Sequence, residues 1–259
     1  MWIDINNHVG HWPYRKLIYD DCRSLLQRMD RFGVDLSVVS SLSGIHFKNT
    51  QSANRDLFQQ WRSTEESKQR LIPYAVINPT YAGWKYDLKQ CVEEYEMQGV
   101  AVYPKYHDYA VDHEALIELV ETARDYDIPV ALTLRMVDHR ARFWMDVKRE
   151  WSLADVMPLI RRVPDAHYLI WNVANSTRLD ENDLRLIKNS EVLMDTSGRT
   201  TNYLSGLLEL FGEDKFAFGS HAPLLDYATG RLRIEYLDHP ETTREKLRSG
   251  NAARFLKLK

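Results

Sequence analysis

Two histidines stand at the ends of the first and the last apolar segments of the chain. His8 follows residues 2–5, and His221 follows residues 215–219. An imidazole titrates near neutral pH, so either side chain could transfer protons or bind a metal. If the chain closes into a barrel, these two segments become neighbouring strands and both imidazoles face one mouth. We therefore name His8 and His221 as candidate catalytic residues.

Polar side chains also follow the apolar segments that lie between these two. Because the carboxyl ends of parallel barrel strands meet at one face, these side chains are expected to share a site. Their amides, hydroxyls and cations could hold a polar or carboxylated compound and stabilise an oxyanion. The candidate substrate-binding residues are Asn6, Asn172, Thr133, Arg135, Lys105 and Tyr103. Further strand-end residues are Ser40, Ser41, Asn78, His107, Asn175, Asp195, Thr196 and Ser220.

Eight apolar segments of strand length alternate with eight amphipathic segments of helix length. Most of the strand segments are continuously apolar, which is typical of parallel strands covered on both faces. The predicted strands are residues 2–5, 34–40, 71–77, 99–103, 129–134, 167–172, 191–195 and 215–219. The predicted helices are residues 20–32, 52–67, 81–97, 112–127, 152–163, 180–188, 203–211 and 242–257. This order predicts an α/β fold, a (β/α)8 barrel of eight parallel strands that forms one domain over residues 1–259.

An open, doubly wound sheet is the alternative fold. That fold normally has a glycine-rich first turn, whereas residues 6–11 read Asn-Asn-His-Val-Gly-His. Gly33 is a natural end for the first helix, and Asp112 could cap the fourth. Two long connections, residues 41–51 and 221–241, are expected at the carboxyl-terminal face of the barrel.

The composition excludes several classes of protein. The chain has 259 residues, of which 44% are hydrophobic, so it can bury a sizeable core. Its net charge of −3 includes no basic stripe, which argues against nucleic acid as a partner. Cys22 and Cys91 lack the spacing of a disulfide framework or a cysteine zinc site. With no apolar stretch of membrane-spanning length and no secretion signal, we expect a soluble, cytoplasmic protein that binds a small molecule and has no membrane partner. Trp61 and Trp84, expected to be exposed on outer helices, are candidate contacts for a homo-oligomer.

Seven segments of the chain, taken in order, resemble the amidohydrolase-related TIM-barrel group. Residues 3–10 stand where that group has Asp-x-His-x-His, and residues 218–223 resemble its Gly-Ser/Thr-Asp-x-Pro motif. The other matching segments are residues 75–79, 99–104, 128–133, 163–172 and 250–255. Each is weakly specific by itself, but together they span nearly the whole chain. The resemblance implies a barrel like those of metal-dependent hydrolases, decarboxylases and lactonases.

Most positions that resemble the metal ligands of this group carry other residues. Only His8 keeps the expected residue. Asn6, Thr133 and Asn172 stand in place of histidine, and His221 stands in place of aspartate. Zinc is usually held by imidazole, thiolate or carboxylate, whereas neutral oxygens suit harder ions. We therefore expect no tightly bound catalytic metal and no other cofactor. Zinc or another divalent metal at His8 and His221 is the alternative.

Three functions stay open from the sequence. The first is a hydrolase of the lactonase or esterase type that acts on a small polar or sugar-derived compound, because the resemblance implies that some relatives are lactonases without a metal requirement. His221 would then activate water, and His8 would serve as a second base or as a hydrogen-bond donor. The second is a metal-dependent hydrolase or decarboxylase with an unusual His8 and His221 centre. The third is an inactive barrel that only binds a ligand.

Some of the polar and aromatic residues have plainer interpretations. His11, His46 and His107 lie in predicted loops and are expected to be surface groups. Asn6 and Asn172 could do no more than satisfy backbone groups, and Arg135 and Lys105 could be solvated or paired with acids. The aromatic residues near the predicted mouth could form a substrate wall or ordinary barrel packing. They are Trp12, Tyr14, Tyr103 and Tyr106.

Overall fold

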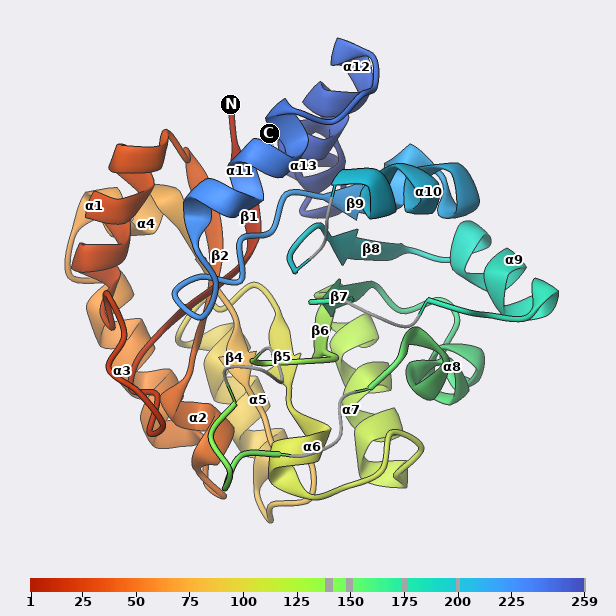
Figure 1. The fold of residues 1–259 in the computed structure, drawn as a ribbon. Helices are drawn as coiled ribbons and strands as arrows, with labels where there is room; N and C mark the ends of the chain where they lie inside the picture. The colour runs from red at the N-terminus through yellow and green to blue at the C-terminus, as the bar shows by residue number, and fades with distance from the viewer. Residues whose placement is uncertain (138–141, 148–150, 174–176, 199–200, 259) are drawn as a thin grey trace.

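A ring of parallel strands surrounded by helices makes up the computed structural model of the chain (Figure 1). The structure describes residues 1–137, 142–147, 151–173, 177–198 and 201–258. The strands are β1 (Ile3–Val9), β2 (Leu36–Ser41), β3 (Leu71–Pro73), β4 (Ala75–Val76), β5 (Val100–Val102), β6 (Val130–Thr133), β7 (Tyr168–Trp171), β8 (Val192–Asp195) and β9 (Phe216–Ala217). Neighbouring strands pair in chain order, and each pair is parallel.

The ring closes between its first and last strands. The amide of Ile5 donates to the carbonyl of Phe218 at 2.9 Å, and that of His8 donates to Ala222 at 2.9 Å. β3 and β4 are one barrel strand interrupted at Tyr74, whose amide donates to Val39 of β2 at 2.9 Å. The predicted (β/α)8 barrel is therefore confirmed.

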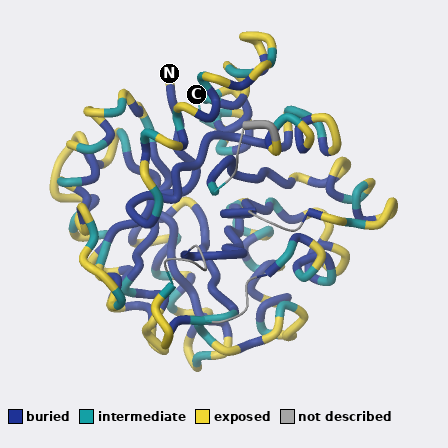
Figure 2. Tube along the Cα trace, in the orientation of Figure 1, coloured by how far each residue is buried: buried dark blue, intermediate teal, exposed yellow. Residues whose placement is uncertain are grey.

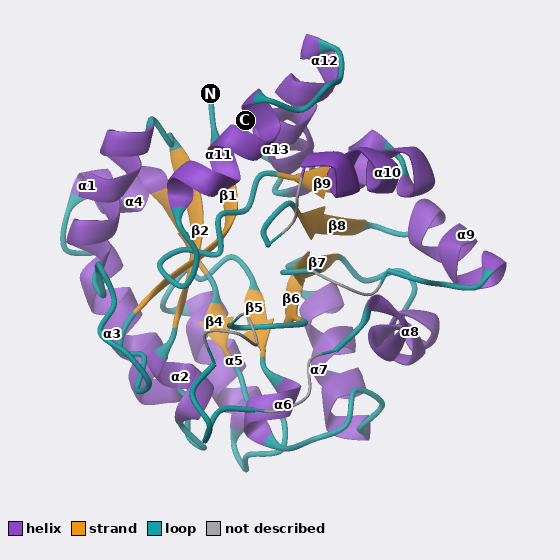
Figure 3. Ribbon diagram, in the orientation of Figure 1, coloured by secondary structure: helices purple, strands orange, loops and turns teal. Residues whose placement is uncertain are grey.

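The helices lie outside the strands (Figure 3), and α13 packs against β1 (Figure 1). They are α1 (Cys22–Phe32), α2 (Ser43–His46), α3 (Gln51–Trp61), α4 (Glu65–Arg70), α5 (Trp84–Glu93), α6 (Pro104–His107), α7 (Glu114–Asp125), α8 (Leu153–Arg162), α9 (Glu181–Asn189), α10 (Thr201–Phe211), α11 (Tyr227–Glu235), α12 (Glu241–Glu245) and α13 (Asn251–Phe255). A 3-10 turn, η1 (Glu213–Lys215), precedes β9, and a π-helical turn, η2 (Lys246–Gly250), joins α12 to α13. Gly33 ends α1 with φ at 59°, as predicted.

Several predicted boundaries were wrong for local reasons. The helix predicted over residues 52–67 is two helices, because Thr64 is extended and its side chain accepts from the amide of Ser67 to begin α4. His113, and not Asp112, caps α7 by accepting from the amide of Ala115. The connection predicted over residues 221–241 contains α11, whose apolar residues do not gather on one face.

The two tryptophans proposed as oligomer contacts are buried. Trp61 is 5% exposed and Trp84 is 7% exposed. The indole of Trp61 also donates to the carbonyl of Leu71 at 3.0 Å, which fixes it against the barrel. The prediction that these side chains are exposed was wrong, because both helices turn their indoles inward.

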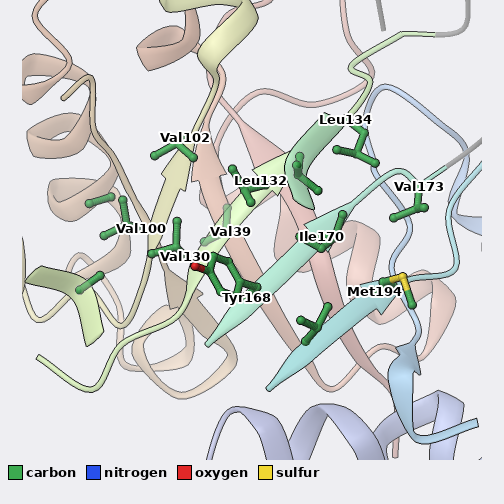
Figure 4. Close-up of a cluster of buried hydrophobic side chains, with 14 of the residues drawn as sticks. Val39, Val100, Val102, Val130, Leu132, Leu134, Tyr168, Ile170, Val173 and Met194 are labelled. Carbon is green, nitrogen blue, oxygen red and sulfur yellow. The ribbon is translucent and has the colours of Figure 1, made fainter. Parts of the chain in front are cut away.

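Alternate strand residues build two separate layers of core. Side chains such as Val100, Leu132 and Ile170 point outward and pack under the helices (Figure 4). Their neighbours in sequence, such as Ala131 and Leu169, fill the inside of the barrel. Burial is therefore continuous along the strands, and exposure is concentrated on the outer helices and loops (Figure 2). Within the described residues, no helix has both the length and the apolar character needed to cross a lipid bilayer.

Candidate active site

A buried carboxylate ties β1 to the turn that follows β9. Asp4 accepts the amide of Ser220 at 2.9 Å and the hydroxyl of Ser220 at 2.6 Å. It also accepts the amide of Asn6 at 3.0 Å. Burial raises the pKa of Asp4 to about 6. These bonds align the two segments that carry His8 and His221.

The two candidate catalytic histidines lie side by side inside the barrel mouth. Their ring centroids are 5.2 Å apart and the rings are perpendicular. Neither side chain is exposed to solvent. Burial lowers the pKa of His8 well below 6.5 and that of His221 to about 4. Both imidazoles are therefore neutral at neutral pH.

His8 has one nitrogen available for chemistry. Its Nδ1 lies 2.9 Å from the hydroxyl of Ser40, which lies 3.1 Å from the hydroxyl of Tyr103. Its Nε2 is buried and has no hydrogen-bond partner among the described residues. Trp171 packs edge-on against the ring at 5.6 Å. The Nε2 atom is therefore a buried polar atom that a ligand or a water could satisfy.

His221 uses both of its nitrogens. Nε2 lies 2.7 Å from the carbonyl oxygen of Met136, and Nδ1 lies 3.0 Å from the amide nitrogen of Asn6. Its backbone has φ at 56°, in the left-handed region that few residues other than glycine adopt. Strain of this kind persists where surrounding contacts determine the geometry, and it often accompanies functional sites.

Asn172 forms hydrogen bonds to Asp195 at the end of β8 and to Arg135 after β6. Its backbone amide donates to Asp195 at 2.9 Å, and its side-chain amide donates to the carbonyl of Arg135 at 2.8 Å. Arg135 in turn donates to the side-chain oxygen of Asn172 at 3.3 Å. The side chain of Arg135 is 7% exposed, so its charge lies in a medium of low polarity.

The other candidate binding residues line one small pocket at the mouth. Tyr103, Lys105, Thr133 and Arg135 all contribute to its wall. The remaining lining includes Tyr106, Met136, Arg142 and Asp146. The space in it that a water molecule can occupy is about 30 Å³, so the pocket is narrow in this structure. Met136 and Val137 fill the rest of the mouth and pack into the barrel core.

The structure also shows what the sequence did not single out. Asp195 accepts hydrogen bonds from Asn6, Asn172 and Ser197, whereas the sequence analysis predicted only that it lies at a strand end. The feature of the sequence that could have indicated this role is the position of Asp195 at the end of a predicted strand. Asn175 lies outside the described residues. His11 and His46 are exposed. His107 is half-buried at the end of α6, and its Nε2 lies 3.1 Å from the carbonyl oxygen of Gly44, so the prediction of a surface loop holds only in part for this residue.

Comparison with protein families identifies the chain. The amidohydrolase family matches residues 49–258. The chain belongs to the amidohydrolase family. A search of curated proteins finds no match.

Solved structures of other amidohydrolase-like barrels share the fold of the chain at low sequence identity. The 5-carboxyvanillate decarboxylase of Sphingomonas paucimobilis superposes with a TM-score of 0.80 at 14% identity, covering 100% of this chain and 99% of its own. The 2,6-dihydroxybenzoate decarboxylase of Rhizobium gives 0.74 at 15% identity, covering 99% and 98%. The dihydroxybenzoic acid decarboxylase of Polaromonas, solved with manganese and the inhibitor 2-nitroresorcinol, gives 0.76 at 16% identity, covering 99% and 97%.

The residues of this chain do not fit the metal that the amidohydrolase family implies. Within the described residues, no three His, Cys, Asp or Glu side chains come together in a way that could hold a metal ion. His221 turns Nε2 to the carbonyl of Met136, and Asn6 and Thr133 supply only neutral groups. Of the two facing histidines, only His8 presents a nitrogen without a partner. One imidazole with neutral oxygens is a weak donor set for zinc or manganese.

Proposed function

We propose that this amidohydrolase is an enzyme that decarboxylates a small aromatic carboxylic acid without a tightly bound metal. The decarboxylases that share its fold act on compounds of this class. The observation that carries the proposal is a buried cation, Arg135, whose charge acts on His221, together with the unpartnered Nε2 of the neighbouring neutral imidazole of His8.

Arg135 supplies the group that would select a carboxylate. A guanidinium binds a carboxylate through paired hydrogen bonds, and the attraction is strongest where water is excluded. The charge of Arg135 is close enough to His221 to contribute to the lowered pKa of that imidazole. Lys105 lines the same pocket, and its ammonium lies 5.1 Å above the ring of Trp151. The acid group would therefore be held beside the two histidines.

In this proposal, His8 supplies the proton that decarboxylation requires. The bond between the ring carbon and the carboxylate breaks, CO2 leaves, and the ring carbon takes a proton from Nε2 of His8. In the same step Nδ1 takes a proton from Ser40, Ser40 takes one from Tyr103 at the pocket wall, and Tyr103 takes one from solvent water, so every group of the relay ends neutral. Burial raises the pKa of Tyr103, so its hydroxyl keeps its proton at neutral pH. Hydrogen-bonded groups in this order can move a proton from the mouth to the buried imidazole.

Hydrolysis of a lactone or ester is the second candidate, and the same nitrogen favours it. With its proton on Nδ1, His8 could accept a proton from water at Nε2. The hydrolytic role predicted for His221 is less favourable, because both of its nitrogens are already engaged. An inactive barrel that only binds an aromatic acid is the remaining alternative.

The test is turnover of hydroxybenzoates and of aryl lactones by the purified protein. We expect CO2 release from an ortho-hydroxybenzoate such as 2,6-dihydroxybenzoate. Arg135→Leu should raise KM by about tenfold or more, since a charged hydrogen bond contributes about 1.5–3 kcal/mol. Arg124→Leu, which removes an exposed guanidinium on α7, is the matched control and should change nothing. Lactone hydrolysis alone would favour the second candidate, and binding without turnover would favour the third.

A further inference from the structure

Asp195 is a buried carboxylate that organises the back of the site. Its side chain is fully buried. One oxygen accepts the amide of Asn172 at 2.9 Å, and the other accepts the hydroxyl of Ser197 at 2.8 Å and the side-chain amide of Asn6. Donors therefore approach both oxygens, so the group acts as an acceptor on each side. Asn6 must turn its NH2 group, and not its oxygen, toward Asp195.

This orientation of Asn6 decides what its amide offers to His221. The same nitrogen that faces Asp195 lies 3.0 Å from Nδ1 of His221, whereas the amide oxygen lies 3.3 Å away. An NH2 group has two protons, one for each of these partners. Nδ1 of His221 therefore accepts a hydrogen bond and carries no proton.

The contact made by Nε2 of His221 independently indicates the same tautomer. Nε2 lies 2.7 Å from the carbonyl oxygen of Met136. A carbonyl can only accept, so Nε2 carries the proton. A neutral imidazole has one N–H, which makes the two assignments consistent. The chain of bonds runs from Asp195 through Asn6 to His221 and ends with an N–H that points into the mouth.

We propose that Asp195, acting through Asn6, is a positioning residue that holds His221 as a neutral hydrogen-bond donor, and that the donor serves a carboxylate oxygen of the substrate. The Met136 carbonyl takes the place of that oxygen in this structure. The positioning role of Asp195 rests on the hydrogen bonds alone. The role of His221 as a donor to the substrate rests on the proposed function. His221 is then a donor to the substrate and not the base that activates water.

The position of Met136 supports the role of its carbonyl as a substitute for a ligand oxygen. Met136 lines the same small pocket as Arg135, the cation expected to hold the carboxylate. Because the carbonyl of Met136 already bonds Nε2 of His221, a substrate oxygen must displace that carbonyl to take its place. The N–H of His221 then keeps a partner only if the substrate supplies an oxygen. A carboxylate oxygen shared between Arg135 and His221 meets this requirement.

The first test measures the tautomer of His221 by NMR, with no substrate present. In the 15N-labelled wild type, the His221 signals, assigned by their loss in His221→Gln, should show a proton on Nε2 and none on Nδ1. Asp195→Asn frees the amide of Asn6 to turn its oxygen toward Nδ1, while Nε2 keeps its proton for the carbonyl of Met136. On acidification, Nδ1 should therefore gain a proton at a higher pH in Asp195→Asn than in the wild type. Ser197→Ala leaves the carboxylate in place and is the matched control, with no change expected. A proton on Nδ1 in the wild type at neutral pH, or an unchanged pH dependence of Nδ1 protonation in folded Asp195→Asn, would overturn the role of Asp195.

The second test separates a donor from a base by using 2,6-dihydroxybenzoate as the probe. His221→Gln keeps an N–H donor, whereas His221→Leu has none. We expect KM to rise by about tenfold or more in the leucine variant and by much less in the glutamine variant, with kcat largely kept in the latter. Equal loss of kcat in both variants would contradict the donor role. If hydroxybenzoates are not turned over at all, the proposed function fails while the NMR result still decides the tautomer.

Discussion

His8 and His221 have the same side chain, but their different hydrogen-bond partners give them different chemical roles. Both imidazoles are buried and neutral, and their rings touch. His221 has partners on both nitrogens, whereas His8 keeps Nε2 unpartnered among the described residues. Proton transfer needs a nitrogen that can reach the reacting atom, and positioning needs an N–H with a fixed direction. The structure therefore favours His8 for proton transfer and His221 for positioning.

Gly219 makes room for the bond between Asn6 and Asp195. A Cβ at this position would lie 2.5 Å from Cβ of Asp195 and 3.2 Å from Cβ of Asn6. We expect Gly219→Ala to lower the free energy of unfolding by about 1–3 kcal/mol, because two strands must move apart. Denaturant unfolding measures the change. Gly206→Ala on α10 is the control, since nothing lies near its Cβ, and it should be neutral or stabilising.

At the scale of elements, the seam between β1 and the turn after β9 decides where the site lies. β1 runs to Val9, four residues beyond the predicted end at residue 5, so Asn6 and His8 belong to the strand itself. The register shifts between Asp4 and Asn7 where β1 pairs with β2. Such an irregularity redirects side chains, and here it accompanies a stretch in which Asn6, Asn7 and His8 are all buried.

Ser220→Ala tests how much this seam contributes to stability. The substitution removes the hydroxyl that donates to Asp4 and that accepts the amide of Ala222 at 3.1 Å. Buried groups that lose a partner cost about 1–3 kcal/mol, so the free energy of unfolding should fall by that amount. Ser63→Ala, which removes an exposed hydroxyl bonded to Gln60, should change stability by less than about 0.5 kcal/mol. Equal losses in the free energy of unfolding for the two substitutions would show that the Ser220 hydrogen bonds do not stabilise the fold more than a surface hydrogen bond does.

At the scale of the whole molecule, buried titrating groups should make stability depend on pH. The pKa values of His8 and His221 are lower in the folded chain than in the unfolded chain. The unfolded chain therefore binds more protons in acid, and the stability present above about pH 6.5 is lost as the pH falls toward 4. Asp4, whose pKa is raised to about 6, opposes this loss as the pH falls below 6. Two imidazoles outweigh one carboxyl, so the net effect is a loss.

The expected size of this effect is on the order of 2 kcal/mol for His221 between pH 7 and pH 5, and His8 acts in the same direction. Melting temperature measured across this range should fall. The slope should be smaller in His221→Gln, which has no imidazole at that position. A melting temperature that is constant or rises on acidification would show that the histidines are not held neutral by burial.

Metal content is a second property of the whole molecule. The donor set predicts that protein purified without chelators carries far less than one zinc or manganese ion per chain. Adding either ion, or removing metals with a chelator, should leave the melting temperature unchanged, because a ligand that binds only the folded state would raise it. Stoichiometric metal in elemental analysis would contradict this prediction. It would also return His8 and His221 to the role of ligands.

The sequence by itself determined the barrel and the face that carries the site. Alternation of apolar strands with amphipathic helices depends on local periodicity, so eight strand–helix units could be counted without a structure. Closure of the ring then made the residues after the first and last strands neighbours, which brought His8 beside His221. The substitutions at the metal-ligand positions were also readable directly from residue types.

Only the tertiary structure decided which atoms face one another. The pairing of Asp195 with Asn6 joins residues that are 189 positions apart, and Met136 reaches His221 across 85 positions. Whether Trp61 and Trp84 point inward depends equally on how each helix rotates against the barrel. Hydrogen-bond direction, tautomer and burial arise from contacts between distant segments, and periodicity along the chain carries no information about them. The chemistry of this site therefore follows from the closed barrel, whereas its location follows from the strand ends.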